Sequence, residues 1–219
     1  MYSVDQIEQL HLESRKYYAR CFELQEQLLV LSENESPRAK EHFVYGVARR
    51  LITIRECLRF FFHHIPPELK AEADQTLQAQ SNANLHAFLI NCAGISDNMA
   101  WFLAYRNGLD NQMDLEKKRH IIGLFNKEFR EHLPERLGKK VDEFQKWHSH
   151  IINHRHPTAH RIPPYVIPYV QFEGTGEIDF TPRYIHAFDK GHPVLLHSQC
   201  ICDIGAVVKL VEALIADLV

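Results

Sequence analysis

Apolar residues recur at intervals of three and four along most of the chain, which is the pattern of helices that bury one face. Three long helices are predicted in the first half, over residues 3–32, 43–65 and 66–107. Gly94 interrupts the helix-forming pattern of the third, and Asn107-Gly108 ends it. Each long stretch therefore provides one apolar stripe for a shared core.

The second half is less regular at first and then changes in composition. A short helix is predicted around residues 116–133, and a fourth main helix over residues 139–154. Residues 157–193 then carry six of the ten prolines, at positions 157, 163, 164, 168, 182 and 193. Because proline cannot extend a helix or a central strand, this segment is predicted to leave the helical pattern.

Within the proline-rich segment, residues 169–172 and 178–180 alternate between apolar and polar types around Gly174-Thr-Gly176, which predicts a β-hairpin. The chain closes with a helix whose apolar stripe runs from Ile204 to Leu218, with Ser198 as its expected N-cap. The fold class is therefore all-α. We expect an antiparallel helical bundle with a small β-hairpin insertion before the C-terminal helix.

The length of 219 residues fits one domain, so residues 1–219 are expected to fold together, with the proline-rich insertion at about 161–193. The formal net charge is −3, so no overall basic field draws the protein to nucleic acid or a membrane, and an anion site has to be local. The five cysteines are scattered and odd in number, which indicates reduced and mostly buried thiols. No signal peptide and no apolar run of roughly 18 residues is found, so we expect a cytoplasmic protein without a membrane partner.

The densest candidate chemistry is a run of five histidines between His148 and His160. His150 and His154 are four residues apart, so on a helix they share a face and could share a metal ion. However, no Asp or Glu occurs between Glu143 and Glu173 to complete or support such a site. A metal-dependent hydrolase is therefore the third alternative, and His148 is expected to pack on an apolar face.

A second interpretation of the same segment is the Arg155-His-Pro-Thr-Ala-His160 spacing, which suits metal-free RNA cleavage. A histidine near neutral pKa can move a proton at the 2′-hydroxyl or the leaving oxygen, and a guanidinium can stabilise the phosphate. With fourteen arginines and fifteen histidines, about one such spacing is expected by chance, and Arg59 and His64 provide another. Context favours Arg155 and His160, because Pro157 is expected to turn the backbone between them at a helix end, whereas Arg59 and His64 sit in a phenylalanine-rich stretch.

At these residues the chain resembles the HEPN superfamily, whose pattern is an Arg, a polar residue, three to five further residues and a His, late in a helical bundle. Here the polar residue is His156, and the stretch from Asp97 to Arg106 is of a kind seen in such bundles. The resemblance implies a metal-independent endoribonuclease of toxin or phage-defence systems without a cofactor. It further implies a homodimer in which two motifs form one site, with an antitoxin as an expected protein partner. Arg155 would bind phosphate, His160 would be the acid or base, and His156 would orient the pair.

The alternative is a non-catalytic HEPN-like module that binds RNA, a nucleotide or a protein partner through the same notch. The insertion between the motif and the last helix departs from the family pattern and could cover the site. Two copies of Arg155 and His160 facing one cleft would favour catalysis, whereas motifs buried under the hairpin would favour the inert module.

Overall fold

The structure is a computed structural model that describes residues 1–186 and 192–219. It is mostly helical, with a small region of antiparallel strands before the C-terminal helix, as predicted. Residues 187–191 of the predicted insertion lie outside the described residues. The helical elements are α1 (Val4–Leu31), η1 (Ser32–Asn34), α2 (Pro37–Lys40), η2 (Glu41–Ala48), α3 (Arg49–His64), α4 (Gln75–Arg106), η3 (Leu109–Asn111), α5 (Lys127–Arg130), α6 (Glu135–Glu143), α7 (Gln145–His160) and α8 (Leu196–Leu218). The strands are β1 (Tyr165–Ile167), β2 (Val170–Gln171), β3 (Ile178–Asp179), β4 (Arg183–Ile185) and β5 (Val194–Leu195).

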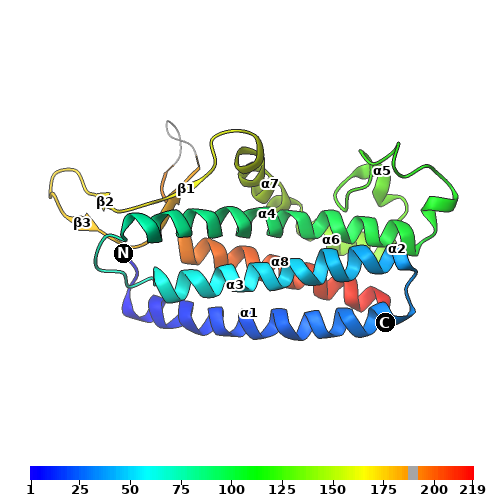
Figure 1. Ribbon diagram of the computed structural model, residues 1–219, viewed down its shortest axis with the longest axis horizontal. Coiled ribbons are helices and arrows are strands. Elements are labelled where there is room, and N and C mark those ends of the chain that lie inside the picture. Colours follow the sequence, from blue (N-terminus) through cyan, green and yellow to red (C-terminus); the bar gives the residue numbers. More distant parts are fainter. Residues whose placement is uncertain (187–191) are drawn as a thin grey trace.

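The long helices α1, α3, α4 and α8 lie along the long axis of the molecule, and α7 packs on the outer side of α4 (Figure 1). Tyr2, just before α1, contacts Ser198 at the start of α8, and Arg20 binds Glu212 further along both helices. These two contacts show that α1 and α8 run in the same direction. The antiparallel order expected for the whole set therefore does not extend to this pair.

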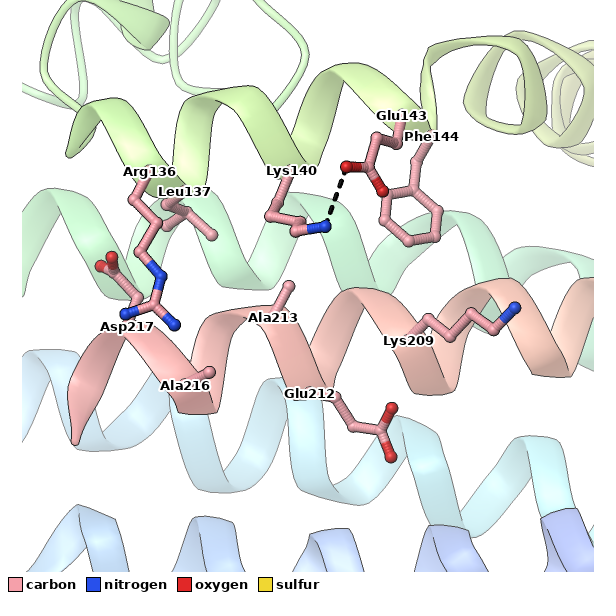
Figure 2. A pocket seen from close by; sticks show the side chains of 10 residues that line it. All are labelled: Arg136, Leu137, Lys140, Glu143, Phe144, Lys209, Glu212, Ala213, Ala216 and Asp217. Atoms are coloured by element: carbon pink, nitrogen blue, oxygen red, sulfur yellow. Dashed lines mark hydrogen bonds and ion pairs between the residues drawn. The ribbon is translucent and has the colours of Figure 1, made fainter.

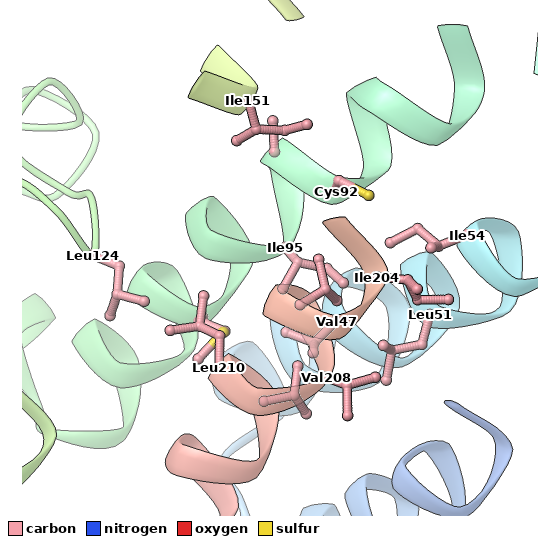
Figure 3. Close-up of a cluster of buried hydrophobic side chains, with 14 of the residues drawn as sticks. Val47, Leu51, Ile54, Cys92, Ile95, Leu124, Ile151, Ile204, Val208 and Leu210 are labelled. Atoms are coloured by element: carbon pink, nitrogen blue, oxygen red, sulfur yellow. The ribbon is translucent and has the colours of Figure 1, made fainter. Parts of the chain in front are cut away.

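The inward faces of these helices form one continuous apolar core (Figure 3). The predicted stripes supply it, with Leu51 and Ile54 of α3, Ile95 of α4, and Ile204 and Val208 of α8 all buried. Burial at about 25 cal/mol per Å2 of apolar surface is the main force that holds such helices together. All five cysteines are free, as predicted, and only Cys202 is exposed.

Gly94 does not interrupt α4, which runs unbroken from Gln75 to Arg106. The helix begins later than the predicted residue 66. The Asp74 side chain accepts a hydrogen bond from the Leu77 backbone amide at 2.8 Å, and this cap sets the start. Gly94 instead makes room for the Arg50 side chain, because a Cβ at this position would lie 2.5 Å from Arg50 Cζ.

Three further boundary predictions are wrong. The predicted helix over 116–133 is reduced to the single turn of α5, which is capped by Asn126. The predicted helix over 139–154 is two helices, α6 and α7, divided at Phe144. Ser198 is not the N-cap of α8, which begins at Leu196; the Ser198 amide donates instead to the Tyr2 hydroxyl at 3.2 Å.

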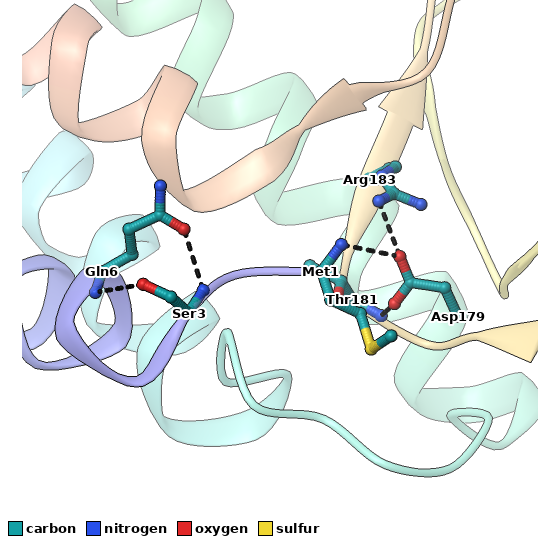
Figure 4. Close-up of polar contacts among 6 residues, drawn as sticks. All are labelled: Met1, Ser3, Gln6, Asp179, Thr181 and Arg183. Carbon is teal, nitrogen blue, oxygen red and sulfur yellow. Dashed lines mark hydrogen bonds and ion pairs between the residues drawn. The ribbon is translucent and has the colours of Figure 1, made fainter.

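The predicted hairpin is present as β2 and β3, with Gln171 paired to Ile178 around Gly174 and Gly176, whose positive φ angles suit glycine. A second sheet, β1-β4-β5, was not predicted. Asp179 of β3 joins this region to the N-terminus by accepting hydrogen bonds from the Met1 amino group and Arg183 (Figure 4). Burial alone would raise the pKa of the Asp179 carboxyl. Hydrogen bonds from Thr181 and the Arg183 guanidinium outweigh burial and lower this pKa to about 2.

Candidate functional site

The predicted motif lies in the last two turns of α7, which remains helical through His160. The expected end of this helix near residue 154 and the expected backbone turn at Pro157 are therefore wrong. Pro157 is tolerated because it stands in the final turn, where its ring removes one hydrogen bond to Asn153. Its own carbonyl still accepts a hydrogen bond from the Arg161 amide at 2.9 Å.

The helical backbone determines which motif side chains meet. Residues five positions apart lie about 140° apart around an α-helix, so Arg155 and His160 are on different faces. His156 and His160 are one turn apart, and their ring centroids lie 5.4 Å from each other on the exposed side. Within one chain, therefore, the fold brings His156 to His160 but does not bring Arg155 to His160, and the proximity expected from a turn is not found.

Arg155 faces α4 instead of the histidines. Its Nη1 lies 3.7 Å from Oδ2 of Asp97, and the arginine side chain remains 38% exposed. Partial burial raises the pKa of Asp97, while the positive charges of Arg155 and Arg50 act to lower it. Asp97 is thus paired with a guanidinium of α7 and influenced by a second one of α3.

His148, on the inner side of α7, is stacked on Phe125 with ring centroids 3.9 Å apart and an interplanar angle of 13°. Burial, reinforced by the positive charge of Arg155, lowers its pKa to about 4. The sequence predicted that His148 packs on an apolar face of the helix. His148 is therefore a packing residue of α7.

His150 and His154 share a face of α7 as the spacing predicted, with ring centroids 4.3 Å apart. The His186 ring lies 4.6 Å from that of His154. His154 is almost fully buried, its Nδ1 donates to the His150 carbonyl, and burial lowers its pKa to about 4. In residues 1–186 and 192–219, no group of three or more His, Cys, Asp or Glu side chains is arranged to hold a metal ion.

The second Arg-x4-His match is also helical and is held by local contacts. Arg59 binds Glu56 at 2.7 Å, and the His64 ring lies 4.7 Å from Phe60. Glu56 also lies 3.4 Å from Arg55, so this match too has a second arginine at its carboxylate. The match serves as an internal comparison for the Arg155 and His160 pair.

Sequence reasoning missed the polar residues that α3 and α4 place next to Asp97. Arg50 donates to Asn98 Oδ1 at 2.7 Å and to Asn91 Oδ1 at 2.9 Å. Asn91, Gly94 and Asn98 recur at helical spacing along α4, which is the signal that the sequence offers. The pattern of one helix does not reveal what the facing helix presents, so Arg50 could not be matched to them.

A separate pocket lies between α6 and α8, far from the motif (Figure 2). Three cationic side chains and three carboxylates line it over an alanine floor: Arg136, Lys140, Lys209, Glu143, Glu212 and Asp217. Lys140 binds Glu143, and Glu212 binds Arg20. Its charges are thus balanced, so it has no excess positive charge for RNA.

No family model, no curated protein and no solved structure matches this chain. None of the helices in the described part of the chain is long and apolar enough to cross a membrane.

Proposed function

We propose that this protein is a cytoplasmic, metal-independent endoribonuclease of the HEPN type that acts as a homodimer in a toxin or defence system. The observation that carries the proposal is the position of Arg155. It is partly exposed near the end of α7 and paired with Asp97, whose carboxyl is also within reach of the positive charge of Arg50. Two neighbouring cations suit a phosphodiester, whose negative charge grows during cleavage.

The proposed reaction needs one proton acceptor, one proton donor and a phosphate clamp. A histidine removes the proton from the RNA 2′-hydroxyl, and the oxygen attacks the adjacent phosphorus. The bond from phosphorus to the 5′-oxygen breaks, the leaving oxygen takes the proton from the imidazolium formed in the first step, and a 2′,3′-cyclic phosphate remains. His160 is assigned the proton transfer, His156 its orientation, and Arg155 the phosphate.

The helical geometry restricts how these groups can act together. Because Arg155 and His160 lie on different faces of one α7, we place Arg155 of one copy opposite His160 of a second copy. An isologous dimer contains two such arrangements, related by its two-fold axis. His156 and His160 are exposed, as a contact of this kind requires.

Incubation of purified protein with mixed RNA in excess chelator tests the activity. Cleavage is expected to persist, to spare DNA because it lacks the 2′-hydroxyl, and to leave cyclic phosphate ends. His160→Ala and Arg155→Ala should each reduce the rate by about 100-fold or more. His64→Ala is the matched control and should cleave like the wild type. Equal rates for His160→Ala and the wild type would remove the catalytic assignment.

A non-catalytic RNA-binding module is the second candidate function. The ion pair between Arg155 and Asp97 favours it, because a guanidinium already paired with a carboxylate has to exchange that partner for phosphate. This candidate predicts that the wild type binds RNA without cutting it. His160→Ala would then bind as tightly as the wild type, whereas Arg155→Ala would bind more weakly.

A further inference from the structure

A pocket of about 400 Å3 opens beside Arg50, between the segment η2, helix α3 and helix α4. Residues 41–48 of η2 form a π-helix, a wider turn that is rare and often stands at functional sites. Gly46 of η2 lies so close to α4 that a Cβ there would be 2.6 Å from Asn98 Cγ. The π-helical turn and its glycine therefore bring one wall of the pocket directly onto the Asn98 side chain.

Arg50 forms the floor, and its positive charge has no carboxylate of its own. Its Nε and Nη1 are held by the neutral amide oxygens of Asn98 and Asn91. In the described chain, no carboxylate lies within ion-pair distance of Arg50; the charge of Asp97 acts on it from further away, and Asp97 forms its ion pair with Arg155. A guanidinium oriented by neutral amides keeps its attraction for an incoming anion, and partial burial strengthens that attraction.

The rim adds a second cation and an exposed aromatic face. The Arg49 guanidinium lies 5.1 Å from the centre of the Tyr45 ring, and Tyr45 is 60% exposed. The one carboxylate of the lining, Glu41, is exposed at the edge. Two arginines thus face one acid, and the pocket has a net positive charge.

His42 completes the lining with a neutral ring. It is stacked against Trp101 and Tyr105, with ring centroids 5.5 Å away in both cases. Burial lowers its pKa, so the ring is uncharged near neutral pH. Its Nδ1 lies 3.4 Å from Asn98 Nδ2. When the Asn98 amide donates to Nδ1, the proton of the neutral ring is on Nε2, which is then a hydrogen-bond donor.

We propose that this pocket binds one nucleotide unit of single-stranded RNA, with the phosphate on Arg50 and Arg49 and the base stacked on Tyr45. A phosphate and a planar base are the ligand groups that a buried guanidinium and an exposed aromatic ring recognise together. The assignment to RNA rests on the proposed function, because Arg50 and Arg155 flank the same carboxylate. One strand can therefore run from the pocket to the motif.

Equilibrium binding of a 2′-O-methyl oligonucleotide tests this inference apart from cleavage, because that strand has no free 2′-hydroxyl to react. Tyr45→Ala should weaken binding by about tenfold through lost stacking. Arg49→Ala should also weaken it and should reduce its salt dependence. Both side chains are exposed, so the variants are expected to fold. The matched controls are Tyr169→Ala, which removes another exposed tyrosine, and Arg59→Ala, which removes another exposed arginine of α3.

Gly94→Ala provides a second variant that reaches the buried cation, because the added Cβ displaces the Arg50 guanidinium. It should weaken binding while thermal melting shows a folded protein. Titration with a nucleoside monophosphate then distinguishes the two sources of the ligand. If the wild type binds the mononucleotide as tightly as the oligonucleotide, the site takes nucleotides in general and the assignment to an RNA strand is overturned. Tighter binding of the oligonucleotide, with the difference lost in Arg49→Ala, supports the strand.

The inference fails if Tyr45→Ala, Arg49→Ala and Gly94→Ala all bind the oligonucleotide like the wild type, or if the wild type does not bind it. This outcome differs from failure of the proposed function. Loss of cleavage in His160→Ala with unchanged binding in Tyr45→Ala would keep the ribonuclease and remove the pocket. Binding that depends on Tyr45 in a protein that cleaves no RNA would keep the pocket and remove the ribonuclease.

Discussion

Asp203 of α8 is a carboxyl buried in the core, with 1% of its surface exposed. It accepts hydrogen bonds from the Trp147 indole and the Gln199 amide, both at 3.1 Å. Burial disfavours the charged form more than these two donors favour it, and the pKa rises to about 7. Between the ordinary pKa near 4 and this value, the folded state holds a proton that the unfolded state has released. The contribution of Asp203 to the free energy of unfolding is therefore complete below about pH 4, and it is lost as the pH rises from there through 7.

Asp203→Asn should remove this loss of stability at high pH, because the asparagine amide keeps an oxygen acceptor and carries no charge. We expect the variant to be more stable than the wild type at pH 8, by up to about 4 kcal/mol, and similar to it near pH 4. Urea unfolding at a series of pH values measures the difference. Parallel pH profiles for the two proteins would show that Asp203 does not titrate in this range.

His148, His154 and His197 affect the pH dependence of stability in the opposite direction to Asp203. Burial lowers the pKa of each to about 4, so the unfolded state takes up their protons first. Their contributions are complete above about pH 6.5 and are lost as the pH falls toward 4. The free energy of unfolding should therefore fall between pH 6.5 and pH 4, and Asp203→Asn should steepen that fall. Unfolding curves at pH 4.5 and pH 6.5 check this; equal stability at both would contradict it.

At the same scale, the sequence identified Arg155, His156 and His160 as residue types suited to phosphate chemistry, but not how they are arranged. Their arrangement depends on whether the backbone turns at Pro157, and local sequence allowed either result. Arg50 was not singled out from the sequence, because its partners, Asn91 and Asn98, are more than forty positions away. The apolar periodicity of one helix does not reveal which residues of a distant helix it contacts.

Among the elements, those with a long apolar stripe were predicted well. The first helix was expected over residues 3–32 and spans Val4–Leu31, because the Ser3 and Gln6 capping box marks its start (Figure 4). Most of the elements without a stripe were not found. β2 and β3 were found because Gly174-Thr-Gly176 marks the turn between them, whereas the equally short β1, β4 and β5 have no such turn and gave no signal. The π-helical turn of η2 packs against α4, which is distant in sequence, so the local pattern could not predict it.

Helix α7 carries a testable consequence of its internal proline. Pro157→Ala restores the missing amide donor in the last turn and should stabilise the helix by about 1 kcal/mol. If Arg155 and His160 act from two copies, the variant should cleave RNA like the wild type, because neither side chain has to leave its face. Thermal melting and single-turnover cleavage are the measurements. A rate loss of tenfold or more would instead show that α7 unwinds at Pro157 to bring both groups together in one chain.

For the whole molecule, the position of α7 decides which surface a functional dimer uses. Helix α7 lies on the outer side of α4, whereas α1 lies across the core from it (Figure 1). The exposed apolar residues of α1, among them Phe22 and Val30, are therefore remote from the motif. A dimer through α1 would leave the two motifs apart, so the proposed site requires contact through α7. Light scattering should show a dimer, and Val30→Glu on α1 should change neither its mass nor its cleavage rate.

Mixing two inactive variants tests that arrangement most directly. Arg155→Ala and His160→Ala should each be inactive alone, because every site of each homodimer lacks one group. After the two are unfolded and refolded together, random pairing makes half of the dimers mixed, and each mixed dimer has one intact site out of two. About a quarter of the wild-type activity is therefore expected, in proportion to the intact sites. Refolding His160→Ala with His64→Ala is the control, since those mixed dimers also retain an intact site. An Arg155→Ala and His160→Ala mixture no more active than its components would exclude a site shared between copies.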